Sequence, residues 1–187
     1  MGEPLLRYDC IKDVCVAIKD LRGSQCKIRV DTSGLFWANT KRLDILYCID
    51  VLSISLNAEN ADKYEMLCKP NIKNSYDVLM DFLRNIKRYE NARKKQGLHF
   101  PEVRLSVVNT SEEQFIPISG RSEYVLGTFP IPDFKECEKI ANSFGWQFII
   151  KRLFRDSRDN RWNNRSFEEL CARGISLDDC KNCSFRH

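Results

Sequence analysis

The sequence contains no run of about 18 apolar residues, the length that a helix needs to cross a bilayer. The first residues do not read as a signal peptide, because Glu3, Arg7 and Asp9 interrupt the apolar ones. The net charge of +4 over 187 residues is too small to indicate a nucleic-acid partner by itself. No nucleophile and base stand in a catalytic arrangement, so we assign no catalytic residue. These absences predict a cytoplasmic protein that does not cross the membrane.

Cysteine, in contrast, is abundant, with nine in the chain. An odd number without a signal peptide argues against a disulfide framework and for reduced thiols or metal ligands. Five of the nine fall in helical apolar patterns, where cysteine packs as a small hydrophobic residue: Cys10, Cys15, Cys48, Cys68 and Cys137. We expect these five in the core.

Apolar periodicity predicts alternating helices and strands. Helices are expected at 4–21, 40–49, about 60–68, 75–95 and 134–144, with a further short one from Ser166. Strands are expected at 27–30, 51–56, 103–108 and 148–153. The first helix would bury one apolar stripe: Ile11, Val14, Cys15, Ile18 and Leu21. Ser75 and Asp133 would cap the helices that follow them, with Glu136 completing a capping box.

Connections of ten or more residues between strands require parallel pairing. The predicted fold class is therefore α/β: a partial TIM-type (β/α)6 barrel with parallel strands, whose first strands are missing. We place this barrel at 1–155 and a charged, cysteine-containing tail at 156–187. Residues 109–132 read as a long irregular loop. In such folds ligands gather at the carboxyl ends of the strands.

Four short motifs stand at those strand ends: Gly2-Glu3-Pro4, Asp31-Thr32-Ser33-Gly34, Ser53-Ile54-Ser55-Leu56-Asn57 and Val108-Asn109. In this order they resemble the strand-end motifs of the radical S-adenosylmethionine (SAM) family. The block from Asp50 to Pro70, with Ile-Ser-Leu-Asn-Ala and then Tyr-x-x-Leu-Cys-Lys-Pro, is similar to the radical SAM proteins linked to TatD-type nucleases. The resemblance covers about residues 1–155.

The resemblance implies SAM contacts at Gly2, Glu3, Pro4, Thr32, Ser33, Ser53, Ser55, Asn57 and Asn109. A carboxylate such as Glu3 suits the ammonium group of SAM, and hydroxyl and amide groups suit its carboxylate and ribose. Gly34 would allow a close backbone approach. Each residue also has a structural interpretation: Gly-Glu-Pro is a common helix start, the serines can be small residues under a helix, and Asn57 can form a turn.

Members of that family hold a [4Fe–4S] cluster with three cysteines, usually spaced Cys-x3-Cys-x2-Cys, and cleave SAM reductively to start radical chemistry on a substrate. That spacing does not occur here. We therefore expect a shortened or degenerate relative, inactive as it stands. Its full-length counterparts would use SAM, the cluster and a substrate that the sequence does not specify.

The tail contains Cys171, Cys180, Cys183 and His187, spaced Cys-x8-Cys-x2-Cys-x3-His. Four such ligands suit tetrahedral zinc, an auxiliary iron–sulfur cluster is a second option, and plain reduced thiols are a third. Six basic residues between Lys151 and Arg165 indicate either binding to a nucleic-acid backbone or a solvated charged surface. The alternative function is thus a non-catalytic binding module that uses this basic tail and a Cys/His metal knuckle.

Overall fold

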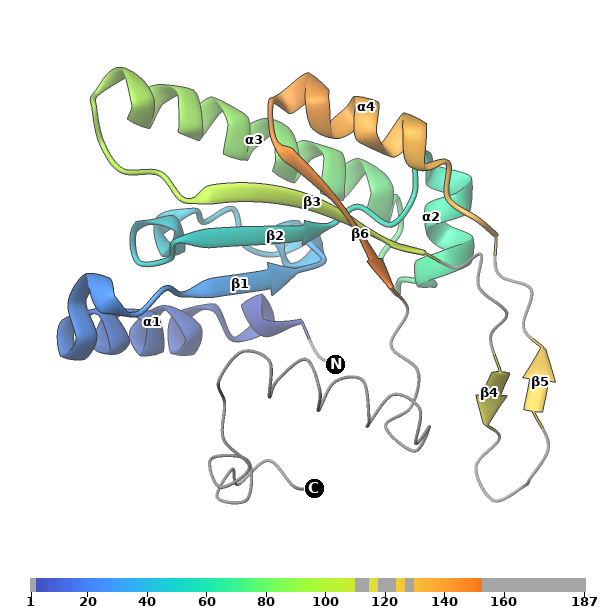
Figure 1. Ribbon diagram of the computed structural model, residues 1–187, viewed down its shortest axis with the longest axis horizontal. Helices are drawn as coiled ribbons and strands as arrows, with labels where there is room; N and C mark the ends of the chain where they lie inside the picture. Colours follow the sequence, from blue (N-terminus) through green and yellow to red (C-terminus); the bar gives the residue numbers. More distant parts are fainter. Residues whose placement is uncertain (1–2, 110–114, 118–123, 127–129, 153–187) are drawn as a thin grey trace, which may run out of the picture. The chain divides into compact units, whose positions relative to one another are not determined.

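The computed structural model describes residues 3–109, 115–117, 124–126 and 130–152 (Figure 1). Its strands are β1 (Arg29–Thr32), β2 (Val51–Ser55), β3 (Glu102–Asn109), β4 (Phe115–Pro117), β5 (Tyr124–Leu126) and β6 (Gln147–Arg152). Its α-helices are α1 (Tyr8–Arg22), α2 (Ala61–Cys68), α3 (Ser75–Lys95) and α4 (Phe134–Phe144). Short 3-10 turns are η1 (Pro4–Arg7), η2 (Gly23–Gln25), η3 (Leu35–Ala38) and η4 (Asp44–Tyr47). None of the helices in these ranges is long and apolar enough to cross a membrane.

The main sheet has four parallel strands in the order β1-β2-β3-β6. The order of these four strands in the sheet is the same as their order along the chain, as in a (β/α) barrel. The antiparallel pair β4–β5 forms a separate two-stranded ribbon. That ribbon falls within 109–132, where the sequence predicts only irregular structure, so the prediction of an entirely irregular segment is wrong.

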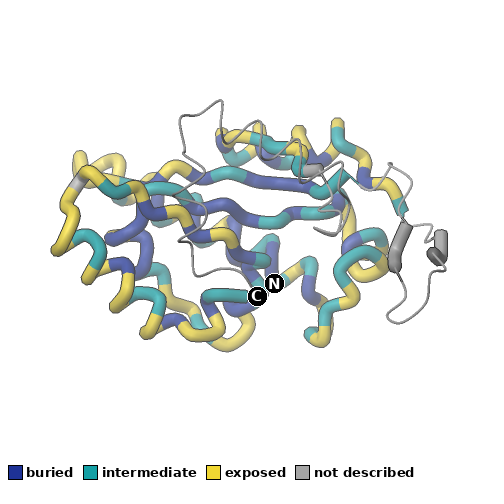
Figure 2. The backbone as a smooth tube through the Cα atoms, turned by 60° about the horizontal axis from the view of Figure 1, so that its bottom comes forward, coloured by how far each residue is buried: buried dark blue, intermediate teal, exposed yellow. Residues whose placement is uncertain are grey.

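The two faces of the main sheet differ sharply in chemistry. Residues paired in register share a face, and successive residues alternate between faces. One face carries apolar side chains that are almost fully buried, including Leu52, Ile54, Leu105 and Val107. Figure 1 shows α3 and α4 beside β3 and β6, and Figure 2 shows strands of the sheet among the most buried segments. The other face carries the serines and charged residues of the sheet together with Val51, Val108 and Ile149, and we call it the polar face.

The main sheet is strongly twisted and curved. Lys151 Nζ on β6 lies 3.1 Å from Asp31 Oδ1 on β1, although two strands stand between them. In a flat sheet, β1 and β6 would be about 14 Å apart, too far for these side chains to meet. The polar face is therefore concave. An α/β protein with a curved parallel sheet is consistent with a partial TIM-type fold, which confirms the predicted fold class.

Helix α1 departs from its predicted packing. Cys15 is buried and Ile11 and Ile18 are half-buried, as expected. Val14 and Leu21 are instead 50% and 81% exposed, so their assignment to the buried stripe is wrong. Cys10 is exposed and Cys68 only partly buried, whereas Cys15, Cys48 and Cys137 are in the core.

The helix predicted at 40–49 is also wrong, because this segment contains only η4. Its apolar residues Leu43, Leu46 and Ile49 recur every third residue, which matches the period of a 3-10 turn rather than that of an α-helix. Asp44 accepts hydrogen bonds from the Tyr8 hydroxyl and from Lys12, and these contacts tie the segment to α1.

Capping is predicted correctly for α4 and wrongly for α3. Asp133 Oδ1 accepts from the N–H groups of Lys135 and Glu136, at 3.0 and 3.1 Å. The capping box is incomplete, because the N–H of Asp133 donates to Glu59 rather than to Glu136. In α3, Asn74 is the residue that precedes the helix, and the buried Ser75 Oγ has no hydrogen-bond partner in the part of the chain that the structure describes. The predicted stripe of α3 is confirmed, with Leu79, Phe82, Leu83 and Ile86 buried and Tyr89 half-buried.

Candidate functional site

The carboxyl ends of the parallel strands lie at one edge of the sheet. The predicted SAM contacts that the structure describes are in these strands or in the segments beside that edge. Glu3 and Pro4 begin η1, Thr32 and Ser33 stand at the end of β1, Ser53, Ser55 and Asn57 belong to β2 or follow it, and Asn109 ends β3. Gly2 lies outside the described residues, as do the four tail residues Cys171, Cys180, Cys183 and His187.

Glu3 holds the N-terminal segment against the end of β1. Its Oε1 accepts from the Leu5 N–H at 3.1 Å and from Thr32 Oγ1 at 2.7 Å. Its Oε2 accepts from the N–H and the hydroxyl of Ser33, at 2.7 and 2.5 Å. Four donors fill the usual acceptor capacity of one carboxylate. A ligand ammonium at Glu3 would have to replace one of them.

Asn57 has an acceptor atom that the described residues leave without a donor. It follows β2 in a left-handed conformation with φ of 58°. Its Nδ2 donates to Cys68 Sγ at 3.4 Å, while its Oδ1 is buried and has no hydrogen-bond partner among the described residues. A buried carbonyl oxygen without a donor is costly, so this atom is suited to a hydroxyl or ammonium group of a ligand.

Tyr64 on α2 is buried and close enough to Cys68 and Glu3 for both to affect its pKa. Burial raises the pKa of the Tyr64 hydroxyl, and the neighbouring Cys68 and Glu3 raise it further. Burial also raises the pKa of Cys68, although hydrogen bonds from Asn57 and Tyr64 oppose this. Both groups are therefore neutral at pH 7, and neither is an activated nucleophile. The Tyr-x-x-Leu-Cys-Lys-Pro motif contains both residues, but neither is among the predicted SAM contacts.

The predicted contacts divide between the two faces of the sheet. Ser53 and Ser55 are on the polar face, whereas the strand register places Thr32 and Asn109 on the helix-covered face. Ser53 is fully buried, and its Oγ lies 3.5 Å from both Arg29 Nη2 and Lys151 Nζ. The sequence pattern predicts no role for Arg29, and Lys151 is predicted both in the strand 148–153 and among the six basic residues from 151 to 165.

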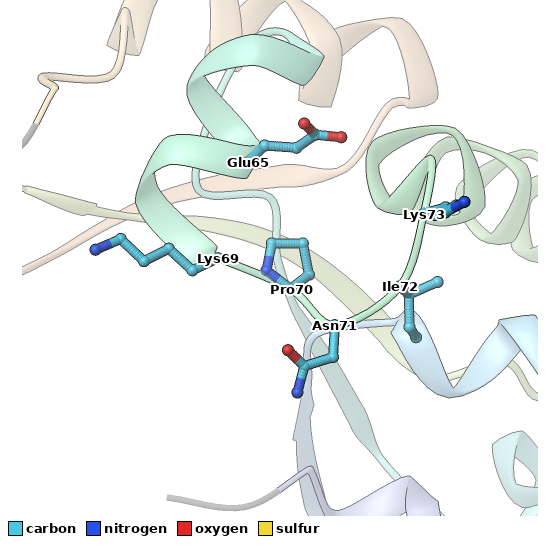
Figure 3. Close-up of a pocket in the computed structure, with 6 residues that line it drawn as sticks. All are labelled: Glu65, Lys69, Pro70, Asn71, Ile72 and Lys73. Atoms are coloured by element: carbon cyan, nitrogen blue, oxygen red, sulfur yellow. The ribbon is translucent and has the colours of Figure 1, made fainter.

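A hollow of about 440 Å³ lies beside the connection from α2 to α3 (Figure 3). It is lined by Glu65, Lys69, Pro70, Asn71, Ile72 and Lys73. None of the predicted SAM contacts lines it. Among the described residues, no group of three or more His, Cys, Asp and Glu side chains is placed to hold a metal ion.

The fold and these strand-end residues define an α/β protein with a curved parallel sheet and polar groups near its carboxyl edge. The chain is similar to the dual-specificity RNA methyltransferase RlmN of Paracoccus denitrificans, with 29% identity over 116 residues. The match covers 60% of this chain and only 28% of that protein. No family model matches the chain, and no solved structure matches it. The similarity supports a relationship to radical SAM proteins, to which RlmN belongs.

Proposed function

We propose that this chain is the SAM-binding part of a radical SAM protein, of the subgroup linked to TatD-type nucleases. The observation that carries the proposal is the order of the strand-end motifs along a curved parallel sheet, from Glu3 through Ser55 and Asn57 to Asn109. The similarity to RlmN supports the radical SAM relationship but does not bear on the subgroup.

Asn57 is the residue best suited to contact SAM directly, because its Oδ1 is buried and has no donor among the described residues. Ser55 stands two residues earlier on the polar face and offers a hydroxyl to the ribose or carboxylate. Glu3 takes a positioning role: it fixes Thr32 and Ser33 and so shapes the end of β1. When bound beside a reduced iron–sulfur cluster, SAM supplies the radical chemistry of the family.

The sequence contains no Cys-x3-Cys-x2-Cys spacing, and the chain spans 28% of the length of the curated relative that it matches. Reductive cleavage of SAM would therefore need cluster ligands from a segment other than these 187 residues. The alternative function, a binding module built on the basic tail, depends on residues outside the described part and stays a prediction.

Binding of SAM tests the proposal. We expect saturable binding by calorimetry, weakened about tenfold by Asn57→Gly, because a buried hydrogen bond to a charged or polar ligand group is lost. Glycine keeps the left-handed backbone, so this variant removes only the side chain. Asn142→Ala, on an exposed position of α4, is the control and should bind as the parent does.

A second measurement decides the matter if the isolated chain binds SAM too weakly to detect. The full gene product would be reconstituted anaerobically with iron and sulfide and tested for SAM cleavage under reducing conditions. The proposal is wrong if that protein takes up no iron–sulfur cluster and neither binds nor cleaves SAM.

A further inference from the structure

The polar face carries a cluster of three cations and two carboxylates that the proposed SAM contacts do not use. It comprises Arg29 and Asp31 on β1, Glu102 and Arg104 on β3, and Lys151 on β6. The strand register places Ser53 between Asp31 and Arg104. The cluster thus draws on all four strands and converges on a buried hydroxyl.

Asp31 is the centre of one half of the cluster. Its Oδ1 accepts from Arg29 Nη2 at 2.6 Å and from Lys151 Nζ at 3.1 Å. Burial raises the pKa of Asp31, but hydrogen bonds from Arg29, Ser53 and Lys151 outweigh this and lower it. Asp31 is therefore ionised at neutral pH and holds two cations on the same side of Ser53.

The cluster has more donors than acceptors. Arg104 bonds Glu102 through Nε and Nη2, at 2.6 and 3.0 Å, which leaves its Nη1 group for another acceptor. Toward the described residues, Arg29 uses only Nη2, for Asp31 and Ser53, and Lys151 has three N–H donors for the same two partners. One positive charge is in excess, and the curvature of the sheet gathers these donors on a concave surface.

Stability alone is a weak reason for this arrangement. The cationic side chains are 26% to 44% exposed and the two carboxylates 50% exposed. Ion pairs of that exposure stabilise a fold little, because solvent screens them and because fixing a lysine or arginine side chain costs conformational entropy. Forked guanidinium groups beside an ammonium are, in contrast, well matched to the oxygens of a phosphate or carboxylate.

We propose that Arg29, Arg104 and Lys151 form an oxyanion-binding site on the polar face, which takes a phosphate or carboxylate group of a ligand lying in the concavity. Asp31 and Glu102 hold the cations in position and compete with the ligand for them. None of these five charged residues is a predicted SAM contact, although Arg29 and Lys151 border Ser53, which is one.

Titration with inorganic phosphate and with malonate, at constant ionic strength and followed by NMR, tests this site. We expect saturable binding of at least one anion, weakened about tenfold by Lys151→Met or Arg104→Met, because each removes a charge-assisted hydrogen bond. Binding of phosphate alone identifies a phosphate-bearing ligand, and binding of malonate alone identifies a carboxylate. The control Lys139→Met removes an exposed cation of α4 and should leave both titrations unchanged.

Two further variants separate binding from structure. Lys151→Arg keeps the charge and should restore most of the affinity lost in Lys151→Met. Asp31→Asn should tighten anion binding severalfold, because it removes the competing carboxylate. The proposal is overturned if the folded protein binds neither anion saturably, or if Asp31→Asn weakens binding as much as Lys151→Met does.

Discussion

Among single residues, Glu3 makes a dense set of polar contacts, with four donors on one carboxylate. In Glu3→Gln the amide nitrogen cannot accept, so at least one donor from Ser33 or Thr32 loses its partner. We expect the free energy of unfolding in urea to fall by about 1–2 kcal/mol. Glu65→Gln, on an exposed carboxylate of α2, should change it by less than about 0.5 kcal/mol. Equal stabilities of the two variants would refute a structural role for Glu3.

Glu90 is a buried source of pH-dependent stability. It is buried and accepts from Lys94, Lys87 and the Trp146 indole, at 2.6, 2.9 and 2.8 Å. Burial raises the pKa of Glu90, but these hydrogen bonds outweigh it and lower the pKa. The unfolded chain therefore binds this proton more tightly than the folded protein does, so the stabilisation declines as the pH falls.

The pH test compares the parent with Glu90→Gln. Their difference in unfolding free energy should be constant above the unfolded-chain pKa of about 4.3 and should shrink as the pH falls from there through the lower folded pKa. Denaturant titrations at a series of pH values measure it. A difference that grows on acidification would contradict the lowered pKa.

At the scale of elements, the contact between Gly34 and α3 fixes how β1 leads into η3. Gly34 has φ of +78°, and a Cβ there would lie 2.8 Å from Phe82 Cδ1 and 3.0 Å from Leu79 Cδ1. The close approach expected at this glycine is therefore to α3. Gly34→Ala combines backbone strain with a clash in the core and should cost about 2–4 kcal/mol.

Gly97 provides the matched control for Gly34. It also has a positive φ, of +66°, but nothing lies within 4 Å of the Cβ position. Gly97→Ala should therefore cost only the backbone strain, about 1 kcal/mol. Thermal unfolding of both variants separates the cost of backbone strain from the cost of the clash with α3. Equal losses of stability would mean that the contact with Phe82 contributes nothing to the cost.

The sequence predicts best those elements whose apolar pattern fits one type of secondary structure with one buried side. The four strands of the main sheet and α3 are predicted within about two residues, because their apolar patterns each have one interpretation, whereas β4 and β5 are missed. Helix α1 is predicted less well, because it has apolar residues on two sides and only the Cys15 side is buried. The segment 40–49 fails because its three-residue spacing fits a 3-10 turn and because Asp44 binds groups on α1.

In the candidate site, the positions of residues along the strands can be predicted, but contacts between distant residues cannot. The strand-end positions of Ser55 and Asn57 follow from local pattern. The Lys151–Asp31 contact joins residues 120 positions apart and depends on the curvature of the whole sheet. No periodicity encodes that curvature, so the charged cluster could not be predicted. The four hydrogen bonds that the Glu3 carboxylate accepts likewise depend on how β1 packs against the segment that contains Glu3.

At the scale of the whole molecule, one continuous core joins the sheet to α1, α3 and α4. Leu105 lies at its centre on β3, fully buried and paired in register with Ile54 and Phe148. Leu105→Ala should lower the free energy of unfolding by about 2–5 kcal/mol, because it removes buried apolar surface and leaves a cavity. Far-UV circular dichroism and tryptophan fluorescence should report the same loss, since Trp37 and Trp146 both belong to this core.

Ile150 tests whether the loss in Leu105→Ala depends on burial. It lies on the same face of the sheet, in register with Val107, but is 49% exposed at the edge strand β6. Ile150→Ala should therefore cost about 1 kcal/mol or less. If the two optical probes separate in Leu105→Ala, the sheet and its helices do not unfold as one cooperative unit. If the two alanine variants are equally stable, the helix-covered face is not the centre of the core.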